Sequence, residues 1–250
     1  MFHTSVFSSS IASAAANQQI TQVTDSVLPP SGSGFLTHPS VRNIVRVVGA
    51  GNLLNKAQLS SPSLKRLTPM DVDPVNVGTL INSPASMYLL DQTPFQLDPD
   101  EELDAFITNS GVGATQTSVM VTFADGPIQP ISKPDFSVRW TATTTLVVNT
   151  WSNCTITFDN GLPSGTYALV GARFMSAGAL FGRVVPRGGP VFRPGTVAVQ
   201  DRNKDPRAFD RHGQMGVWLT FPNTVPPSVD IFSLSADTTE EGIFDLVKIA

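Results

Sequence analysis

The chain has 250 residues, which suffices for one large β domain or two small ones with a buried core. Charged residues make up 14% of it, against roughly 25% in a typical soluble domain. We therefore expect other copies of the chain or other partners to cover much of its surface, the alternative being a compact β protein rich in Ser and Thr. The net charge of −4 argues against a general nucleic-acid-binding surface, and a single cysteine excludes an internal disulfide.

Residues 1–34 are predicted to form an extended N-terminal arm. They are rich in Ser, Ala and Gln and end in Pro29–Gly34, a composition typical of a flexible joint. Within the arm, Ser8–Gln19 is compatible with a short helix. The arm has no Lys or Arg ahead of its weak apolar stretch, so it is a poor match to a signal peptide. No apolar run reaches about 18 residues, so no membrane-spanning helix is predicted.

Residues 35–125 are predicted to form a first β domain. The spacing of the apolar residues in Val41–Val48 is helical, but their β-branched side chains and the turn residues Gly49–Asn52 favour a strand. Four further strands are predicted at Ser86–Leu90, Phe95–Leu97, Leu103–Thr108 and Ser118–Phe123.

Residues 126–134 are predicted to be a linker, because the Gly and Pro residues of Ala124–Pro130 interrupt strand pairing twice. Residues 135–250 then alternate apolar strands with turn signals about every 8–12 residues, a pattern typical of two packed antiparallel sheets. The fold class predicted for the chain is all-β, with two consecutive jelly-roll domains, which are antiparallel β-sandwiches, after the arm. The strands predicted in residues 135–250 are Ser137–Val148, Cys154–Phe158, Tyr167–Phe174, Ala179–Val185, Thr196–Val199, Gly216–Phe221, Val229–Ser235 and Gly242–Ile249.

The sequence predicts no catalytic residue, no metal site and no cofactor. The three histidines, His3, His38 and His212, are far apart, and none has the spacing of zinc ligands. The sequence contains no G-x-S-x-G elbow, no P-loop and no G-x-G-x-x-G motif. We therefore expect a building block rather than an enzyme.

Other chemistry-bearing residues favour structural interpretations. The acidic run Asp98–Glu102 offers hard oxygen ligands for calcium, but such runs are more often solvated loops. Cys154 lies in an apolar strand pattern and is predicted to be a buried, inert thiol. Trp140, Trp151 and Trp218 lie in or beside apolar strands and are predicted core residues. An exposed Trp would instead favour a carbohydrate-binding role.

Several segments of the second half occur in an order that resembles a known family, the double jelly-roll major capsid proteins of tailless icosahedral bacteriophages. The likeness covers residues 41–250. It is closest after residue 135 and weaker in the first half, where it rests on Ser61–Leu64 and the strand that ends at Ala124. The segments that carry it in the second half are Leu162–Gly171, Ser176–Leu180, Arg193–Gly195, Gly216–Trp218, Pro226–Asp230 and Ala236–Thr238.

The resemblance implies a viral structural protein that self-assembles as pseudo-hexameric homotrimers into an icosahedral capsid enclosing the genome. It implies contacts with neighbouring capsomers and with minor capsid or penton proteins, and no sequence-specific contact with nucleic acid. The expected location is the virion, after assembly in the host cytoplasm. Members of this family often enclose a membrane, so contact with an internal membrane is left open.

The arm is the expected clamp between subunits. Its candidate assembly contacts, which suit lipid or protein equally well, are Phe2, Val6, Phe7 and Ile11. Two other functions were weighed for the chain. One is a receptor- or carbohydrate-binding β-sandwich module of a virion spike, and the other is an enzyme on a double-barrel scaffold.

Overall fold

The computed structural model describes residues 1–51, 55–64, 70–72, 87–89, 93–109, 111, 113–131, 133–188, 191–199 and 211–250. Every extended regular element in these residues is a β-strand, so the all-β class is confirmed. No helix among them is long and apolar enough to cross a membrane. Their contacts divide into two compact units. We call residues 4–127 the N-terminal unit, and residues 1–3 together with 128–250 the C-terminal unit; the division falls within the expected linker, 126–134.

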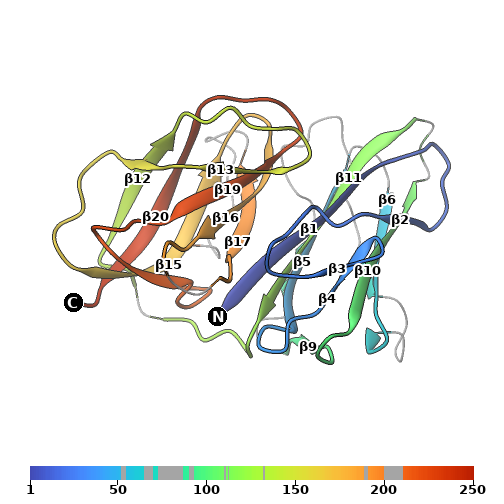
Figure 1. The fold of residues 1–250 in the computed structure, drawn as a ribbon, viewed down its shortest axis with the longest axis horizontal. Helices are drawn as coiled ribbons and strands as arrows, with labels where there is room; N and C mark the ends of the chain where they lie inside the picture. Colours follow the sequence, from blue (N-terminus) through green and yellow to red (C-terminus); the bar gives the residue numbers. More distant parts are fainter. Residues whose placement is uncertain are drawn as a thin grey trace. The chain divides into compact units, whose positions relative to one another are not determined.

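The N-terminal unit has two sheets (Figure 1). The first has the strand order β1-β11-β5-β8, with β9 also paired to β5. The second has the order β3-β4-β10-β6-β7, with β2 also paired to β10. The strands are β1 (Phe2–Ile11), β2 (Gln18–Ile20), β3 (Pro30–Ser31), β4 (Gly34–Leu36), β5 (Asn43–Gly51), β6 (Asn55–Ser60), β7 (Met70–Val72), β8 (Met87–Leu89), β9 (Phe95–Gln96), β10 (Glu102–Asn109) and β11 (Thr115–Ala124).

Aromatic residues join these two sheets into one core. Phe7 on β1 stacks on Phe35 of β4, with ring centroids 5.1 Å apart. Phe35 also meets Phe123 of β11 edge-on at 5.8 Å. All three rings are buried, so burial of their large apolar surfaces stabilises the packing of one sheet on the other.

The prediction of a short helix within Ser8–Gln19 is wrong, because β1 continues to Ile11 and β2 begins at Gln18. Pairing of β1 with β11 outweighs the helix propensity of the Ala and Gln residues, a weak preference that tertiary contacts often override. Residues 4–34 thereby belong to the N-terminal unit rather than lying outside it. The strand expected at Val41–Val48 is confirmed as β5, but the turn expected to follow it is wrong at Gly49–Gly51, because these residues continue the ladder with β11.

The C-terminal unit forms one curled sheet path with the order β13-β19-β16-β17-β15-β20-β12-β14, and β18 is paired to β15 (Figure 1). The link between β17 and β15 is parallel and only two residue pairs long, so the path folds into two antiparallel halves. The strands are β12 (Phe136–Ala142), β13 (Trp151–Cys154), β14 (Thr157–Phe158), β15 (Thr166–Met175), β16 (Ala179–Val185), β17 (Gly195–Val199), β18 (Leu219–Pro222), β19 (Ser228–Ser233) and β20 (Glu240–Lys248).

Two glycines make room for the aromatic core of this unit. Trp140 lies edge-on to Phe174, with ring centroids 5.9 Å apart. A Cβ on Gly182, in β16, would collide with the Phe174 ring, and one on Gly242, in β20, would collide with the Trp140 ring. The aromatic core therefore occupies the space that side chains at these two positions would need.

Most strand predictions differ from the structure only at their ends. The strand expected at Ser137–Val148 ends at Ala142, because the chain then leaves the sheet and Leu146 N donates instead to Asp237 O, at 2.9 Å. The strand expected at Cys154–Phe158 is split between β13 and β14, which lie in different halves of the sheet path. Of the strand expected at Ser86–Leu90, the two end residues lie outside the described residues.

Candidate functional site

The four predicted assembly contacts, Phe2, Val6, Phe7 and Ile11, are all buried within the single chain. Val6, Phe7 and Ile11 belong to the N-terminal unit and Phe2 to the C-terminal unit. Their role in assembly stays a prediction. The structure gives them a role in the folded chain itself, because burial of such side chains stabilises the fold.

Sequence reasoning missed the pairing that places these residues. Thr4 Oγ1 lies 3.1 Å from Thr122 Oγ1, and Ser8 Oγ lies 2.8 Å from Ser118 Oγ. Thr4 and Ser8 are four residues apart on β1, and their partners Thr122 and Ser118 are four residues apart on β11, in the opposite order. Matching hydroxyls on facing strands are a cross-strand pairing signal, and this signal is visible in the sequence.

The acidic run Asp98–Glu102 is used by its own loop. The Glu101 carboxylate accepts hydrogen bonds from Ser63 N at 2.6 Å, from Ser63 Oγ at 2.5 Å and from Asp98 N at 2.8 Å. Burial acts to raise the pKa of Glu101, but hydrogen bonds from Ser61, Ser63 and Asp98 outweigh it and lower the pKa below its usual value. These contacts make Glu101 the anchor of the turn at Ser61–Leu64.

The three histidines are held in separate surroundings. His3 is buried and its Nδ1 accepts from Arg193 N at 3.2 Å, whereas His38 Nδ1 accepts from Ser40 N at 3.1 Å. His212 is more than half exposed, with its Nδ1 3.8 Å from Asp245 Oδ2. Among the described residues, no group of three or more His, Cys, Asp and Glu side chains is arranged to hold a metal ion.

Asp245 is the centre of a polar cluster on the outer side of β20. Its buried carboxylate pairs with Arg211 through Nε at 2.6 Å and Nη2 at 2.9 Å, and accepts from Ser137 Oγ at 2.5 Å and from His212 N at 2.9 Å. Burial acts to raise the pKa of Asp245, but the Arg211, Ser137 and His212 hydrogen bonds and the charge of Arg211 lower it. The cluster fastens the segment that begins at Arg211 onto the sheet.

A second buried ion pair joins β16 to β19. Arg183 Nε lies 2.9 Å from Asp230 Oδ2, and Arg193 Nη1 approaches the same oxygen at 3.1 Å. The Arg183 guanidinium also lies over the Trp151 ring, 4.2 Å from its centroid. These contacts satisfy Asp230 within the strands, so the pair serves the fold.

Cys154 and Glu240 lie inside the C-terminal unit. Burial raises the pKa of Cys154 to about 11, and the Glu240 and Asp230 carboxylates add to this effect. The expectation of a buried thiol is confirmed. Because the thiolate is the reactive form of cysteine, the raised pKa suppresses the reactivity of Cys154. Burial also raises the pKa of Glu240, to about 7.

A groove of about 480 Å³ follows one edge of the C-terminal unit, between Phe136–Arg139 of β12 and the loop Asp159–Pro163. On this side, β12 pairs with β14 at only Trp140 and Thr141. One further ladder bond runs from Asp159 N to the carbonyl of Arg139, at 3.0 Å. The loop then leaves the strand, which opens the groove.

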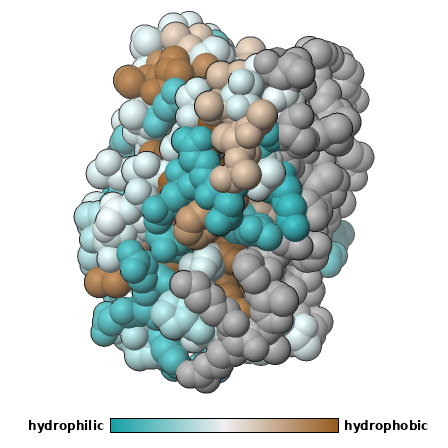
Figure 2. Space-filling view, turned by 90° about the vertical axis from the view of Figure 1, so that its right-hand side faces the viewer, coloured by the Kyte–Doolittle hydropathy of each residue, from teal (hydrophilic) through white to brown (hydrophobic). Residues whose placement is uncertain are grey.

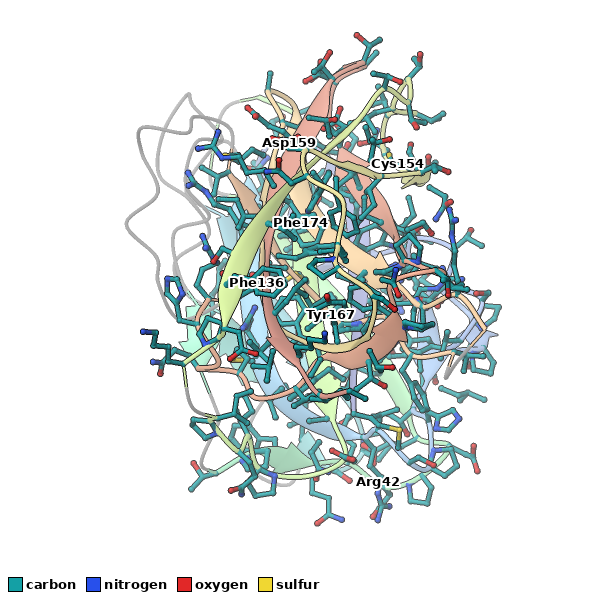
Figure 3. All side chains as sticks on the ribbon, turned by 90° about the vertical axis from the view of Figure 1, so that its left-hand side faces the viewer. Arg42, Phe136, Cys154, Asp159, Tyr167 and Phe174 are labelled. Carbon is teal, nitrogen blue, oxygen red and sulfur yellow. The ribbon has the colours of Figure 1, made fainter. Side chains whose placement is uncertain are left out.

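The groove combines a ring with charged groups. Phe136 is half-buried and meets Tyr167 edge-on at 5.8 Å (Figure 3). The Tyr167 hydroxyl donates to the carbonyl of Pro163 at 2.7 Å, which fixes the loop wall. Arg139 and Asp159 are exposed on the rim. A ring, a cation and an anion around one hollow suit a small ligand that is partly apolar and partly polar.

Figure 2 shows one face of the molecule, on which the visible hydrophobic residues lie in small patches among hydrophilic and neutral ones. Apolar residues scattered in this way are normal on protein surfaces. The candidate binding site that the structure offers is the groove beside β12.

Comparisons with known proteins add little to this geometry. A scan against protein families finds no match, and a search of curated proteins finds none. Among solved structures, the glycoside hydrolase domain of Endo-D from Streptococcus pneumoniae is similar at 9% identity with a TM-score of 0.29. The alignment covers 92% of this chain and 33% of that chain, so the chain spans about a third of its length. A TM-score this low carries no argument about fold or function.

Proposed function

We propose that the chain is a major capsid protein that assembles as homotrimers into an icosahedral shell. The observation that carries the proposal is the strand order of the C-terminal unit. Strands β12, β20, β15 and β18 are neighbours in one half of the sheet path, and β13, β19, β16 and β17 in the other. An arrangement of this kind in eight of the nine strands suits a jelly roll, the architecture of many viral capsid domains and of lectins.

The N-terminal unit supports the finer proposal of two jelly rolls. In the C-terminal unit the first strand pairs with the last, β12 with β20, and the second with the last but one, β13 with β19. The N-terminal unit has a similar closing pattern among its strands from β5 onward, because β5 pairs with β11 and β6 with β10. Two units with similar closing patterns suit duplicated architecture and a trimer with six similar lobes.

The low charge of the chain also supports assembly rather than catalysis. Only 14% of its residues are charged, which suits a surface that neighbouring subunits cover. We infer that such a protein acts in the virion, through repeated contacts between capsomers and with minor capsid or penton proteins. It has no need of a cofactor or of sequence-specific nucleic-acid binding.

The native mass of the full chain tests this proposal. Light scattering should give about three times the 26.6 kDa of the monomer, and electron microscopy of the same sample should reveal trimers or hexagonally tiled shells. A chain that remains monomeric at high concentration contradicts the capsid proposal.

The groove beside β12 favours a second candidate function, a receptor- or carbohydrate-binding module of a virion spike. The half-buried ring of Phe136 and the rim residues Arg139 and Asp159 provide the apolar surface and polar groups that a sugar ring needs. A glycan array probed with the full chain tests it. Binding that is lost in Arg139→Ala and retained in Lys133→Ala, an exposed residue outside the groove, would support this function.

A further inference from the structure

Glu240 is a carboxyl group enclosed in the interior of the C-terminal unit. It is the first residue of β20 and is fully buried. The alternation along β20 points it to the same side as Gly242, against which the Trp140 ring packs. Within the described part of the chain, neither carboxyl oxygen has a hydrogen-bond partner. A polar group in this position is unusual, because buried polar atoms are nearly always hydrogen-bonded.

Within the described part of the chain, the one charge that acts on the Glu240 carboxyl is negative. Across β12 its partner is Ala142, and from β13 the nearby titratable group is the Cys154 thiol. Asp230 of β19, which like Glu240 acts on the Cys154 thiol, has its charge taken up by Arg183 and Arg193. The loop before β20 contributes Asp237, a second carboxylate whose charge raises the pKa of Glu240.

The hydroxyl of Ser176, which lies near Glu240, is already engaged. Ser176 would favour the charged form of Glu240, but its Oγ donates to Asp237 Oδ2 at 3.0 Å. The same Asp237 oxygen accepts from Ala177 N at 3.0 Å, and Asp237 Oδ1 accepts from Thr238 N at 2.8 Å. Asp237 is thus stabilised as an anion, and Glu240 is left without a donor.

An ionised carboxylate in such a place is costly, because it has lost its water and gained neither a cation nor a hydrogen bond. The neutral acid is therefore the form that the folded unit accommodates.

Asp237 lies at the point where three loops meet. Its carbonyl accepts from Leu146 N at 2.9 Å, while its carboxylate binds the turn at Ser176 and Ala177.

We propose that Glu240 is a pH-sensitive switch: the closed C-terminal unit accommodates its neutral carboxyl, and ionisation of that carboxyl releases residues 235–241. Release is local because residues 235–239 belong to the loop between β19 and β20, which Asp237 anchors to two other loops, and residues 240 and 241 are the first of β20. The inference concerns the single chain and does not depend on the proposed capsid function.

The direction of the pH effect follows from proton binding. The unfolded chain loses the Glu240 proton near the ordinary pKa of 4.5, whereas the folded chain keeps it until about pH 7. Between these values the folded state binds more protons, so the stability of the unit falls as the pH rises and levels off above about 7.

The decisive variant is Glu240→Gln in the full chain, which keeps the shape of the side chain and removes its charge. Between pH 5.5 and pH 8, the melting temperature of wild type should fall by roughly 5 °C more than that of the variant. Hydrogen exchange of residues 235–242, corrected for intrinsic rates, should lose protection above about pH 7 in wild type alone. Equal pH dependence in the two proteins overturns the proposal.

A direct titration keeps the proposal testable if the variant does not fold. The chain has four glutamates, Glu101, Glu102, Glu240 and Glu241, so carboxyl ¹³C labelling of glutamate gives four signals. One signal should titrate near pH 7 in wild type, and replacement of Glu241 by Gln, as the matched control, should leave it in place. Four signals that all titrate below about pH 5.5 overturn the proposal.

Discussion

At the scale of single residues, the C-terminal unit depends on close packing at some positions and on fully paired charges at others. Gly242 lies against the Trp140 ring and the carbonyl of Arg173, and Asp245 accepts every donor around it. Both arrangements are specific to one residue type. Small changes at these two positions should therefore have larger effects than changes at exposed positions nearby.

Gly242→Ala should destabilise the C-terminal unit by about 1–3 kcal/mol, because the added methyl group overpacks the core beside Trp140. Denaturant unfolding followed by tryptophan fluorescence measures the effect. Gly161→Ala is the matched control, since a Cβ there meets nothing within 4 Å. Equal stability of the two variants would contradict the assigned packing.

Asp245→Asn should destabilise the unit by about 3 kcal/mol near pH 7, because it leaves the Arg211 guanidinium without its counter-charge. The folded-state pKa of Asp245 lies below its ordinary 3.8. The stabilisation is therefore present above about pH 4 and is lost as the pH falls through the lowered value.

Unfolding measured between pH 2.5 and pH 7 should accordingly be less acid-sensitive in Asp245→Asn than in wild type. The control is Asp159→Asn, a change at an exposed residue on the rim of the groove. An acid response identical in wild type and Asp245→Asn would show that Arg211 and Asp245 are not coupled as described.

At the scale of elements, β1 is the strand whose role differs most from the expectation. It was predicted to lie in an arm that clamps subunits, and the structure pairs it with β11. Its ring at Phe7 also reaches Phe35 on the opposite sheet. An element that contributes both to a sheet ladder and to the core is part of the fold, whatever it contributes to assembly.

Phe7→Ala should destabilise the N-terminal unit by about 3–5 kcal/mol, because it empties the space beside Phe35. Thermal unfolding of the full chain should reveal the loss, and Ser10→Ala, an exposed position on the same strand, should have little effect. If Phe7→Ala kept wild-type stability but blocked particle formation, the arm interpretation would be preferred.

At the scale of the whole molecule, both units close by pairing strands from their two ends. In the C-terminal unit β20 lies between β12 and β15, so the last strand completes a sheet whose other members precede it in the chain. Such non-local pairing makes each unit dependent on its terminal strand.

A chain that ends at Thr239 should lose the C-terminal unit and keep the N-terminal one, because β20 pairs with both β12 and β15. Limited proteolysis followed by mass spectrometry should then leave a resistant fragment near residues 4–127. A resistant fragment that includes residues 128–239 would argue against this dependence.

The local signals of the sequence were sufficient for the all-β class, for most strands and for the buried state of Cys154. Alternating apolar residues and turn residues act over a few positions, so they are readable without knowledge of distant partners. The strand predicted at Val41–Val48 was identified in this way through its β-branched residues, although it continues through Gly49–Gly51, where a turn was expected.

Only the tertiary structure decided where the chain's first residues go and which polar groups are enclosed. Thr4 meets Thr122 across 118 residues, and Ser137 meets Asp245 across 108. The burial of Glu240, on the last strand of its unit, likewise requires the first strand, β12, to be in place. Local propensity cannot determine such features, because their energies come from contacts between segments that are far apart in the chain and meet only on folding.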